Sequence, residues 1–330
     1  MGEVFITRRG GSGSFSVKLP KFSYDGNHSL IEDGNGNWRL KLYDTGNLVF
    51  TEHPGVLEVF LVGGGGGGAY KSSTNRGNGG GGGGYTITSM VAADSIVVNE
   101  SYLATIGDGG AANTDGGITS IFGISAAGGH TGIGGSDKEA VGGAGGSGGG
   151  GGVASSGAND YGGNGGSDGE DGTQAYRSAT SLYGPGGEGQ GFTTREFGTL
   201  VTKAYIVGTV PAAVDWLSDS EGGTALVPNK DVIYSVMTTG DYWYKDYIWN
   251  GLSYEQTDIA QVYAGGGGGN GQDTYGLGGA GGGGDGVGTK KPSADSGDPN
   301  TGGGGGAGGS TAAATGSGGS GIIVIRNYRG

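Results

Sequence analysis

A strand pattern that runs directly into glycine restricts the fold of this chain more than any other feature. In LEVFLVGGGGGGAY, residues 57–70, an apolar run is followed by six consecutive glycines. Glycine has no side chain to bury, and it loses more backbone freedom on folding than any other residue. Further glycine tracts occur at 79–84, 142–152, 162–166, 184–191, 265–269, 278–286 and 302–309. The fold must therefore order these tracts without a hydrophobic core inside them.

One ordered conformation suits such tracts. A glycine run can adopt the polyproline II conformation, which has three residues per turn and no internal hydrogen bonds. Its N–H and C=O groups must then bond to neighbouring chains. Because 88 residues are glycine, ordering their backbone costs on the order of 100 kcal/mol. We therefore expect a dense network of backbone hydrogen bonds between glycine helices, held at its ends by β-strands.

The composition also fits a disordered linker, which is the opposing interpretation. The 17 Tyr, 8 Phe and 4 Trp, together with strand patterns on both sides of the tracts, favour an ordered fold. The absence of cysteine excludes disulfides and thiolate metal sites. A net charge of −13 argues against nucleic-acid binding. No stretch is long and apolar enough for a membrane span, and we expect no signal peptide.

Strand patterns bracket the glycine tracts. They occupy 13–19, 37–44, 48–50 and 57–62, a second β-type region at 85–107, and the C-terminal 321–330, which we expect to pair with 57–62. The expected fold is mainly β plus a polyglycine II helix bundle, with a small β-sandwich-like cap closed by the first and last strands and no significant α-helix. The expected division is a cap (1–62 with 321–330), a first glycine part (63–200), an aromatic insert (201–261) and a second glycine part (262–330).

Several stretches together carry a family resemblance. They are VFLVGGGGGGAY (59–70), GGGGGGYTITS (79–89), TIGDGG (105–110), GGITSIFG (116–123), TTREFG (193–198), VYAGGGGG (262–269) and GSGGSGIIVIRNY (316–328). In them the chain resembles the glycine-rich tip adhesins and tail-fibre proteins of bacteriophages, in which strands lead into a polyglycine II bundle. A similar glycine-rich domain is present in animal receptor kinases of the anaplastic lymphoma kinase type, usually with cysteines.

The insert departs from this resemblance. In the family pattern, TREFG is followed after a few residues by YAGGGGG, whereas here about 60 residues intervene. They include Trp216, Trp243 and Trp249. Hairpin signals at Gly240-Asp241 and Asn250-Gly251 predict strands at 231–238, 242–249 and 252–256. The insert resembles a small β-module that is common in phage tail proteins.

Aromatic residues in the insert form the first candidate site. Alternation places Tyr242, Tyr244, Asp246 and Ile248 on one face of the strand, and Trp243, Lys245, Tyr247 and Trp249 on the other. A three-stranded meander has one inner face at most, so some aromatics are expected to be exposed and suited to stacking on sugars or contacting a protein. The alternative is that both faces are packed. The candidate receptor-binding residues are Tyr242, Trp243, Tyr244, Tyr247, Trp249 and Tyr254.

Aromatic residues in the loops between tracts form a second candidate site, made of Tyr161, Tyr176, Tyr183 and Phe192. By the resemblance, loops at the bundle tip contact the host. Alternatively, these side chains cap the helix ends as small clusters.

Cation and catalytic sites find little support. DGNGNW, residues 33–38, has the oxygen spacing of a Ca²⁺ loop, but Trp38 stands where glycine is required, so a turn is favoured. SDGEDG, residues 167–172, suits a solvated loop. His28, His53 and His130 lie far apart in the sequence and suggest no metal site. We expect no enzyme, no cofactor and no metal.

The resemblance implies a non-enzymatic phage tail adhesin, made in the host cytoplasm and located in the virion tail. Its partners would be a bacterial cell-surface glycan or outer-surface protein and other virion tail proteins, without nucleic acid or membrane insertion. A homo-oligomer is left open. The alternative function is a structural subunit of a tail fibre or extracellular filament, and a third is an enzyme acting on surface glycans.

Overall fold

The computed structural model describes residues 19–34, 36–71, 77–134, 140–153, 162–165, 167, 169–175, 189, 194, 196–197, 262–271, 274–289, 291–309 and 311–329. It also gives the backbone of strands at 7–8 and within 202–256. The described residues form β-strands, extended glycine runs and short 3-10 helices, with no α-helix among them, as the sequence predicts. No helix in this part of the chain has the length and apolar character needed to cross a membrane.

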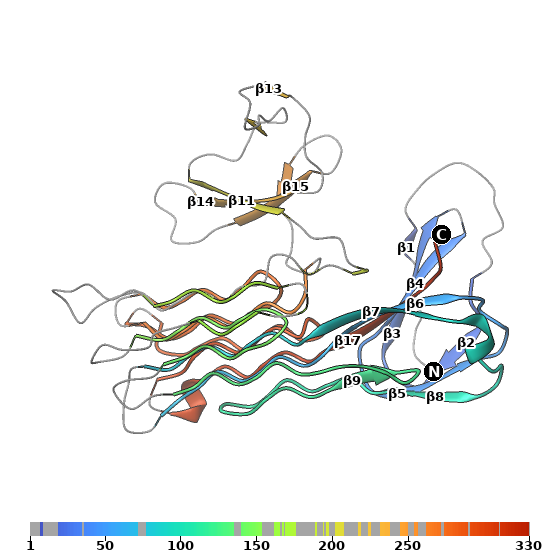
Figure 1. Cartoon of the computed structure of the whole chain (residues 1–330), viewed down its shortest axis with the longest axis horizontal. Helices are drawn as coiled ribbons and strands as arrows, with labels where there is room; N and C mark the ends of the chain where they lie inside the picture. The colour runs from blue at the N-terminus through green and yellow to red at the C-terminus, as the bar shows by residue number, and fades with distance from the viewer. Residues whose placement is uncertain are drawn as a thin grey trace.

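Two sheets form the cap (Figure 1). The larger has the strand order β1 (Thr7–Arg8), β3 (His28–Gly34), β4 (Asn37–Leu42), β17 (Ile322–Asn327), β6 (Leu57–Val62) and β7 (Thr86–Val91). The smaller has the order β2 (Phe22–Tyr24), β5 (Gly46–Phe50) and β8 (Ser101–Ala104). A 3-10 turn, η1 (Ala93–Ser95), and a hairpin of β9 (Thr119–Ile121) and β10 (Ile124–Ala126) complete the cap.

The hydrophobic core of the cap lies between its two sheets. Alternating residues of β4 and β5, such as Leu40, Leu42, Leu48 and Phe50, are fully buried, as period-2 alternation predicts. The predicted pairing of the last strand with residues 57–62 is confirmed, because β17 runs antiparallel to β6 from Ile322↔Val62 to Asn327↔Leu57. β17 also pairs with β4, so the C-terminal strand lies inside the sheet rather than at its edge.

The glycine tracts form a hydrogen-bonded bundle with a three-residue period. In the tract that follows β6, the N–H groups of Gly63, Gly66 and Ala69 donate to the carbonyls of Tyr85, Gly82 and Gly79. The intervening residues Gly64 and Gly67 donate to 117 and 114, and Gly65 and Gly68 donate to 319 and 316. The N–H groups of three consecutive residues thus donate in three different directions, as expected for a helix with three residues per turn. The hydrogen bonds therefore confirm the predicted polyglycine II conformation.

The carbonyls of the same tract point toward three further neighbours. Gly64 O accepts from Gly129 N, Gly65 O from Gly110 N, and Gly66 O from Gly305 N, all at 2.8–2.9 Å. The tract at 63–69 is therefore surrounded by six others, and every backbone direction has a partner. A Cβ on any of Gly63 to Gly68 would lie 1.9–2.1 Å from a neighbouring carbonyl oxygen, which explains why these positions are glycine.

The insert contains its own four-stranded sheet, with the order β11 (Thr202–Val207), β14 (Val232–Met237), β15 (Lys245–Trp249) and β16 (Tyr254–Gln256). A separate strand pair joins β12 (Leu217–Ser218) to β13 (Thr224–Ala225). The three predicted strands correspond to β14, β15 and β16, although 242–244 lie outside the described residues. The sequence prediction missed β11, which pairs in parallel with β14.

Candidate functional site

The outer face of the larger sheet holds a second, smaller cluster of buried residues. Phe60 and Val62 of β6, with Ile322 and Val324 of β17, point away from the core between the sheets. They pack against Tyr263 and Ala264, which begin the second glycine part. Farther along the same face, charged residues replace apolar ones, because Arg39 and Lys41 alternate with the inward-facing Leu40 and Leu42 of β4.

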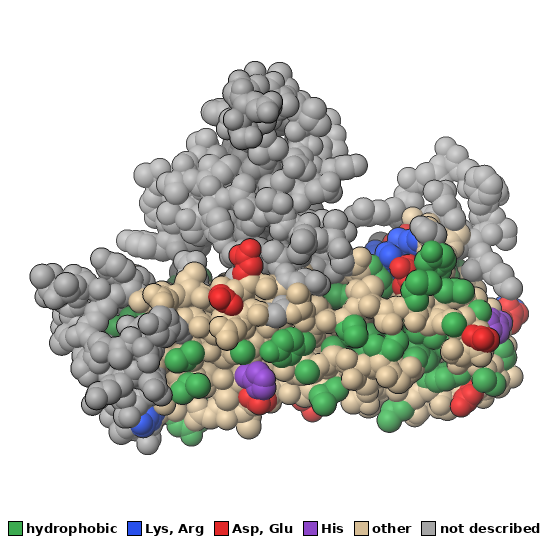
Figure 2. Space-filling model, viewed as in Figure 1, with side chains coloured by type: hydrophobic (Ala, Val, Ile, Leu, Met, Phe, Trp, Pro, Cys, Tyr) green, Lys and Arg blue, Asp and Glu red, His purple; other side chains and the backbone are tan. Residues whose placement is uncertain are grey.

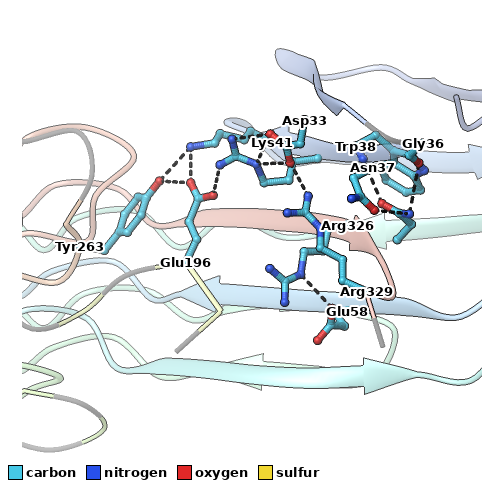
Figure 3. A network of polar contacts seen from close by, with 12 residues as sticks. Asp33, Gly36, Asn37, Trp38, Lys41, Glu58, Glu196, Tyr263, Arg326 and Arg329 are labelled. Carbon is cyan, nitrogen blue, oxygen red and sulfur yellow. Dashed lines mark hydrogen bonds and ion pairs between the residues drawn. The ribbon is translucent and has the colours of Figure 1, made fainter. Parts of the chain in front are cut away.

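Glu196, from the TREFG motif, is the centre of the charged group (Figure 3). Its carboxylate accepts hydrogen bonds from Lys41 Nζ and from Arg39 Nη1. It also accepts the hydroxyl of Tyr263 at 2.6 Å, and Lys41 Nζ donates to that hydroxyl at 3.1 Å. The segment that leads into the insert is thereby tied both to the sheet and to the segment that leaves the insert.

Further ion pairs extend the group along β4 and β17. Arg39 donates to Asp33 through Nε at 2.8 Å and through Nη2 at 2.9 Å. Arg329 pairs with the same carboxylate, and Arg326 donates from Nε to Glu58 Oε2 at 2.9 Å. Asp33, the first residue of the DGNGNW stretch considered above as a Ca²⁺ loop, instead lies at the end of the β3–β4 hairpin and accepts from two arginines.

The pKa values of the group are coupled by burial and charge. Burial alone would raise the pKa of Glu196, but Lys41, Tyr263 and Arg39 outweigh it and hold that pKa below its usual value. Burial and the Glu196 charge both raise the pKa of Tyr263. Glu196 is therefore a carboxylate and Tyr263 a neutral donor over the whole neutral range.

Aromatic contacts also hold the same two segments against the larger sheet. Phe60 contacts both Phe197, at a ring-centroid distance of 6.1 Å, and Tyr263, at 5.5 Å. The guanidinium of Arg326 lies 3.8 Å from the centre of the Phe197 ring, which is cation–π geometry. Phe197 and Ala264 both have φ of +59°, a conformation that residues with a side chain adopt only where the surroundings impose it.

These contacts bring the two ends of the insert together. Tyr263 N donates to Thr194 O at 2.9 Å, so the chain leaves the bundle and returns to it at adjacent points. All the carboxylates of the group, on Asp33, Glu58 and Glu196, are in ion pairs. An arrangement whose charges are already paired with one another is suited to holding the two segments that flank the insert on the cap.

The structure locates only part of the predicted aromatic site. Tyr247 and Trp249 lie on β15, where Trp249 is in register with Tyr254 of β16. Tyr242, Trp243 and Tyr244 lie outside the described residues, and so do Tyr161, Tyr176, Tyr183 and Phe192. Of SDGEDG, Asp171 accepts from Gly165 N at 2.7 Å and thus closes the turn between two glycine runs.

The flanks of several loops meet at the end of the bundle far from the cap. Asn78, which is fully buried, donates from Nδ2 to Gly308 O at 2.8 Å and to Gly309 O at 3.0 Å. Asn270 N donates to Asn78 O, and Val153 N donates to Asn270 O. Residues 154–161, which include Tyr161, follow Val153 directly and lie outside the described residues. We call this meeting point, made by Asn78, Val153, Asn270 and Gly308, the distal end.

The sequence prediction did not identify Glu196, Tyr263 or Asn78 as functional residues. A signal for the first two was present, because TREFG and VYAGG are the two motifs that the insert separates. No comparable signal marks Asn78, which is an ordinary polar residue beside a glycine tract.

Comparison with known proteins places the chain among glycine-rich proteins. A family model described as a glycine-rich domain matches residues 44–328. The match includes the bundle, the insert and the cap strands from β5 onward, and it leaves out β1 to β4. No curated protein matches the chain.

Proposed function

We propose that this chain, which belongs to the glycine-rich domain family, is a non-enzymatic receptor-binding adhesin of a bacteriophage tail. It recognises a receptor on the bacterial surface, either a glycan or a protein, through its aromatic insert and the loops at the distal end. The bundle and the cap act as a rigid support that fixes the geometry of both surfaces before binding.

The observation that carries this proposal is the anchor at Glu196. A binding module joined by a flexible linker would lose orientational freedom on binding, and that loss weakens affinity. Here both ends of the insert are held, by Glu196 with Lys41 and Arg39 on one side and by Tyr263 on the other. Such an anchor is useful to a protein that presents its insert to a partner.

The Trp and Tyr residues of the insert favour a ligand on the bacterial surface. Trp and Tyr supply large rigid contact surfaces at low entropic cost and are enriched in the residues that dominate protein interfaces. Trp249 and Tyr254 are opposite each other in register on β15 and β16. A pair of aromatic residues at such positions suits stacking on a sugar ring or packing against a protein loop.

The first test is binding of the labelled full-length protein to a panel of bacterial strains. We expect saturable binding to a subset of strains. A variant in which a short Gly-Ser linker replaces residues 201–261 should fold, because the anchor points Thr194 and Tyr263 are already hydrogen-bonded, and it should lose that binding. The paired variants Trp249→Ala and Tyr254→Ala should weaken binding, whereas Ile118→Ala, at an exposed residue next to β9 of the cap, should not.

Two results would overturn the proposal. One is the absence of binding to every strain by a folded protein that assembles into fibres, which would favour the structural subunit. The other is full binding by the variant that lacks the insert and by variants of the distal loops, which would remove both candidate surfaces.

A further inference from the structure

An open groove lies on the cap, and none of its lining residues belongs to the insert or to the distal end. It has a volume of about 630 Å³ and is bounded by β7, β8, η1 and the turn between β9 and β10. Met90 of β7 and Leu103 of β8 line it, yet their side chains are 56% and 60% exposed. Figure 2 shows hydrophobic side chains gathered on the visible face of the cap, with acidic side chains near its end.

The backbone beside the groove is an open sheet edge. β7 is the last strand of its sheet and pairs only with β6 among the described strands. Thr86 N donates outward to Ser167 Oγ, so alternation along an antiparallel ladder also turns the N–H and C=O groups of Thr88 and Met90 away from β6. Within the described part of the chain, neither residue bonds to another backbone group on that side.

Such an edge is unusual in a protein that does not use it. Exposed edges normally carry charged residues, prolines or bulges that prevent a further strand from pairing. The β7 sequence TITSMV has no charged residue and no proline, and its register with β6 is regular. The edge therefore remains competent to accept another strand.

The floor of the groove is held in a strained conformation. Phe122 and Gly123 form the two-residue turn between β9 and β10, with φ of +53° and +75°. Both values are positive, as a type I′ turn requires, and a bulky residue such as Phe rarely adopts them. The ring of Phe122 packs edge-on against Tyr102 at 5.1 Å. The Tyr102 hydroxyl in turn accepts from Val97 N at 2.7 Å, so the aromatic wall is fixed in place.

The charged residues in the segments that form the groove walls are all acidic. Asp94 and Glu100 are exposed, and each is adjacent in sequence to a residue that lines the groove, Ser95 or Ser101. The segments that form the walls, 85–107 and 116–126, contain no Lys or Arg. A partner with basic residues is favoured at such a surface, and a like-charged partner is disfavoured.

We propose that this groove and the β7 edge together form a docking site for an extended segment of a different protein, with apolar side chains and flanking Lys or Arg. The segment adds a strand to β7 by bonding to Thr88 and Met90, and its apolar side chains occupy the groove between Met90, Leu103 and Phe122. Charge argues against a second copy as the occupant, since each copy would bring the same acidic rim and a net charge of −13. The site goes beyond the proposed function, because it would attach the chain to a carrier whatever the insert binds.

The test uses the full-length protein and a short synthetic peptide of alternating Val and Thr with Lys at both ends. A second peptide carries Glu in place of Lys. We expect saturable binding of the basic peptide, at least about tenfold weaker binding of the acidic one, and slower hydrogen exchange at the amides of Thr88 and Met90 when the basic peptide is bound.

Two variants make the test specific. Met90→Lys places a positive charge on an exposed side chain, and Thr88→Pro removes an outward N–H without removing a bond to β6. Each should reduce binding of the basic peptide by about tenfold or more. Ile133→Lys is the matched control, since Ile133 is 52% exposed on the bundle and its replacement should leave binding unchanged.

Three outcomes would overturn the inference. The first is equal or absent binding of both peptides. The second is binding without protection of the Thr88 and Met90 amides, which would indicate an apolar ligand in the groove rather than an added strand. The third is dimerisation of the unmodified protein that Met90→Lys abolishes, which would make a second copy the occupant.

Discussion

The hydroxyl of Tyr263 donates a hydrogen bond to Glu196 Oε1 at 2.6 Å, although 67 positions separate the two residues in sequence. Nearly all the intervening chain is the aromatic insert. The bond closes the base of the insert, and both partners are also in contact with Lys41 on the cap. The contact between the two segments that flank the insert therefore depends on a few side chains that can be changed one at a time.

Replacing Tyr263 with Phe removes only the hydroxyl. We expect a loss of ~1.5–3 kcal/mol in the free energy of unfolding, the range for a hydrogen bond to a charged group, with the aromatic contact to Phe60 retained. Denaturant unfolding measures the loss, and hydrogen exchange within 202–207 and 232–237 should report faster opening of the insert. Tyr328→Phe is the control, because Tyr328 is 47% exposed. An equal effect of both changes would contradict the assigned role of the bond.

Protonation of Glu196 should lower the free energy of unfolding in acid. Burial raises the pKa of this carboxyl. Lys41, Tyr263 and Arg39 lower it by more than burial raises it, so the net shift of the pKa is downward. A carboxyl with a lowered folded-state pKa contributes stability that is complete above the unfolded pKa of about 4.3 and is lost as pH falls through the folded value.

The check is a series of unfolding measurements from about pH 7 to about pH 3 on the unmodified protein and on Glu196→Gln. The variant should be less stable at neutral pH by about 3–5 kcal/mol, because Lys41 and Arg39 lose their shared charge partner. Its stability should also depend less steeply on acid pH. Parallel curves for the two proteins would show that Glu196 does not titrate differently in the folded and unfolded states.

Local patterns in the sequence were enough to predict β4, β6 and β17 of the cap and the glycine tracts at 63–68, 79–84 and 302–309. They missed β2 and β3, and the strand predicted at 13–19 lies almost wholly outside the described residues. The apolar run at 57–62 and the β-branched run near the C-terminus fix β6 and β17, because a sheet buried on both faces requires near-continuous apolar residues. The anchor could not be predicted in this way. Glu196 and Lys41 are 155 positions apart, and no local pattern relates them.

The glycine bundle shows a further limit of sequence prediction. The run at 127–133 belongs to the bundle although it contains few glycines, and its residues Ala127, His130 and Ile133 are exposed while Gly129 and Gly132 are buried. An outer helix with three residues per turn needs glycine only where it faces its neighbours. A search for unbroken glycine tracts therefore finds inner helices and misses outer ones.

Inner glycines should tolerate no side chain. A Cβ on Gly66 would lie 2.1 Å from His130 O, which is backbone that cannot move without breaking other bonds of the bundle. We expect Gly66→Ala to destabilise the protein by about 3 kcal/mol or more. Gly309→Ala is the matched control, because no atom lies within 4 Å of its Cβ position. Calorimetric unfolding compares the two, and a similar melting temperature for both variants would contradict the close packing of the inner helices.

Asn78 provides the test of the distal end. Its amide nitrogen donates to the carbonyls of Gly308 and Gly309, and its side chain is fully buried. Asn78→Asp keeps the shape but places a carboxylate opposite two carbonyl oxygens, so burial and the loss of both donated bonds should raise the pKa of the new carboxyl. A raised folded-state pKa gives a contribution to stability that is present at low pH and lost as pH rises. We therefore expect Asn78→Asp to be destabilised by several kcal/mol near pH 7 and to recover part of that loss toward about pH 4. This pH dependence is opposite in sign to that expected from Glu196.

Asn78→Ala is the control, and it should lose stability without this pH dependence. If the aspartate variant behaves like the alanine variant across the pH range, the buried amide does not hold the loop flanks together as the structure indicates.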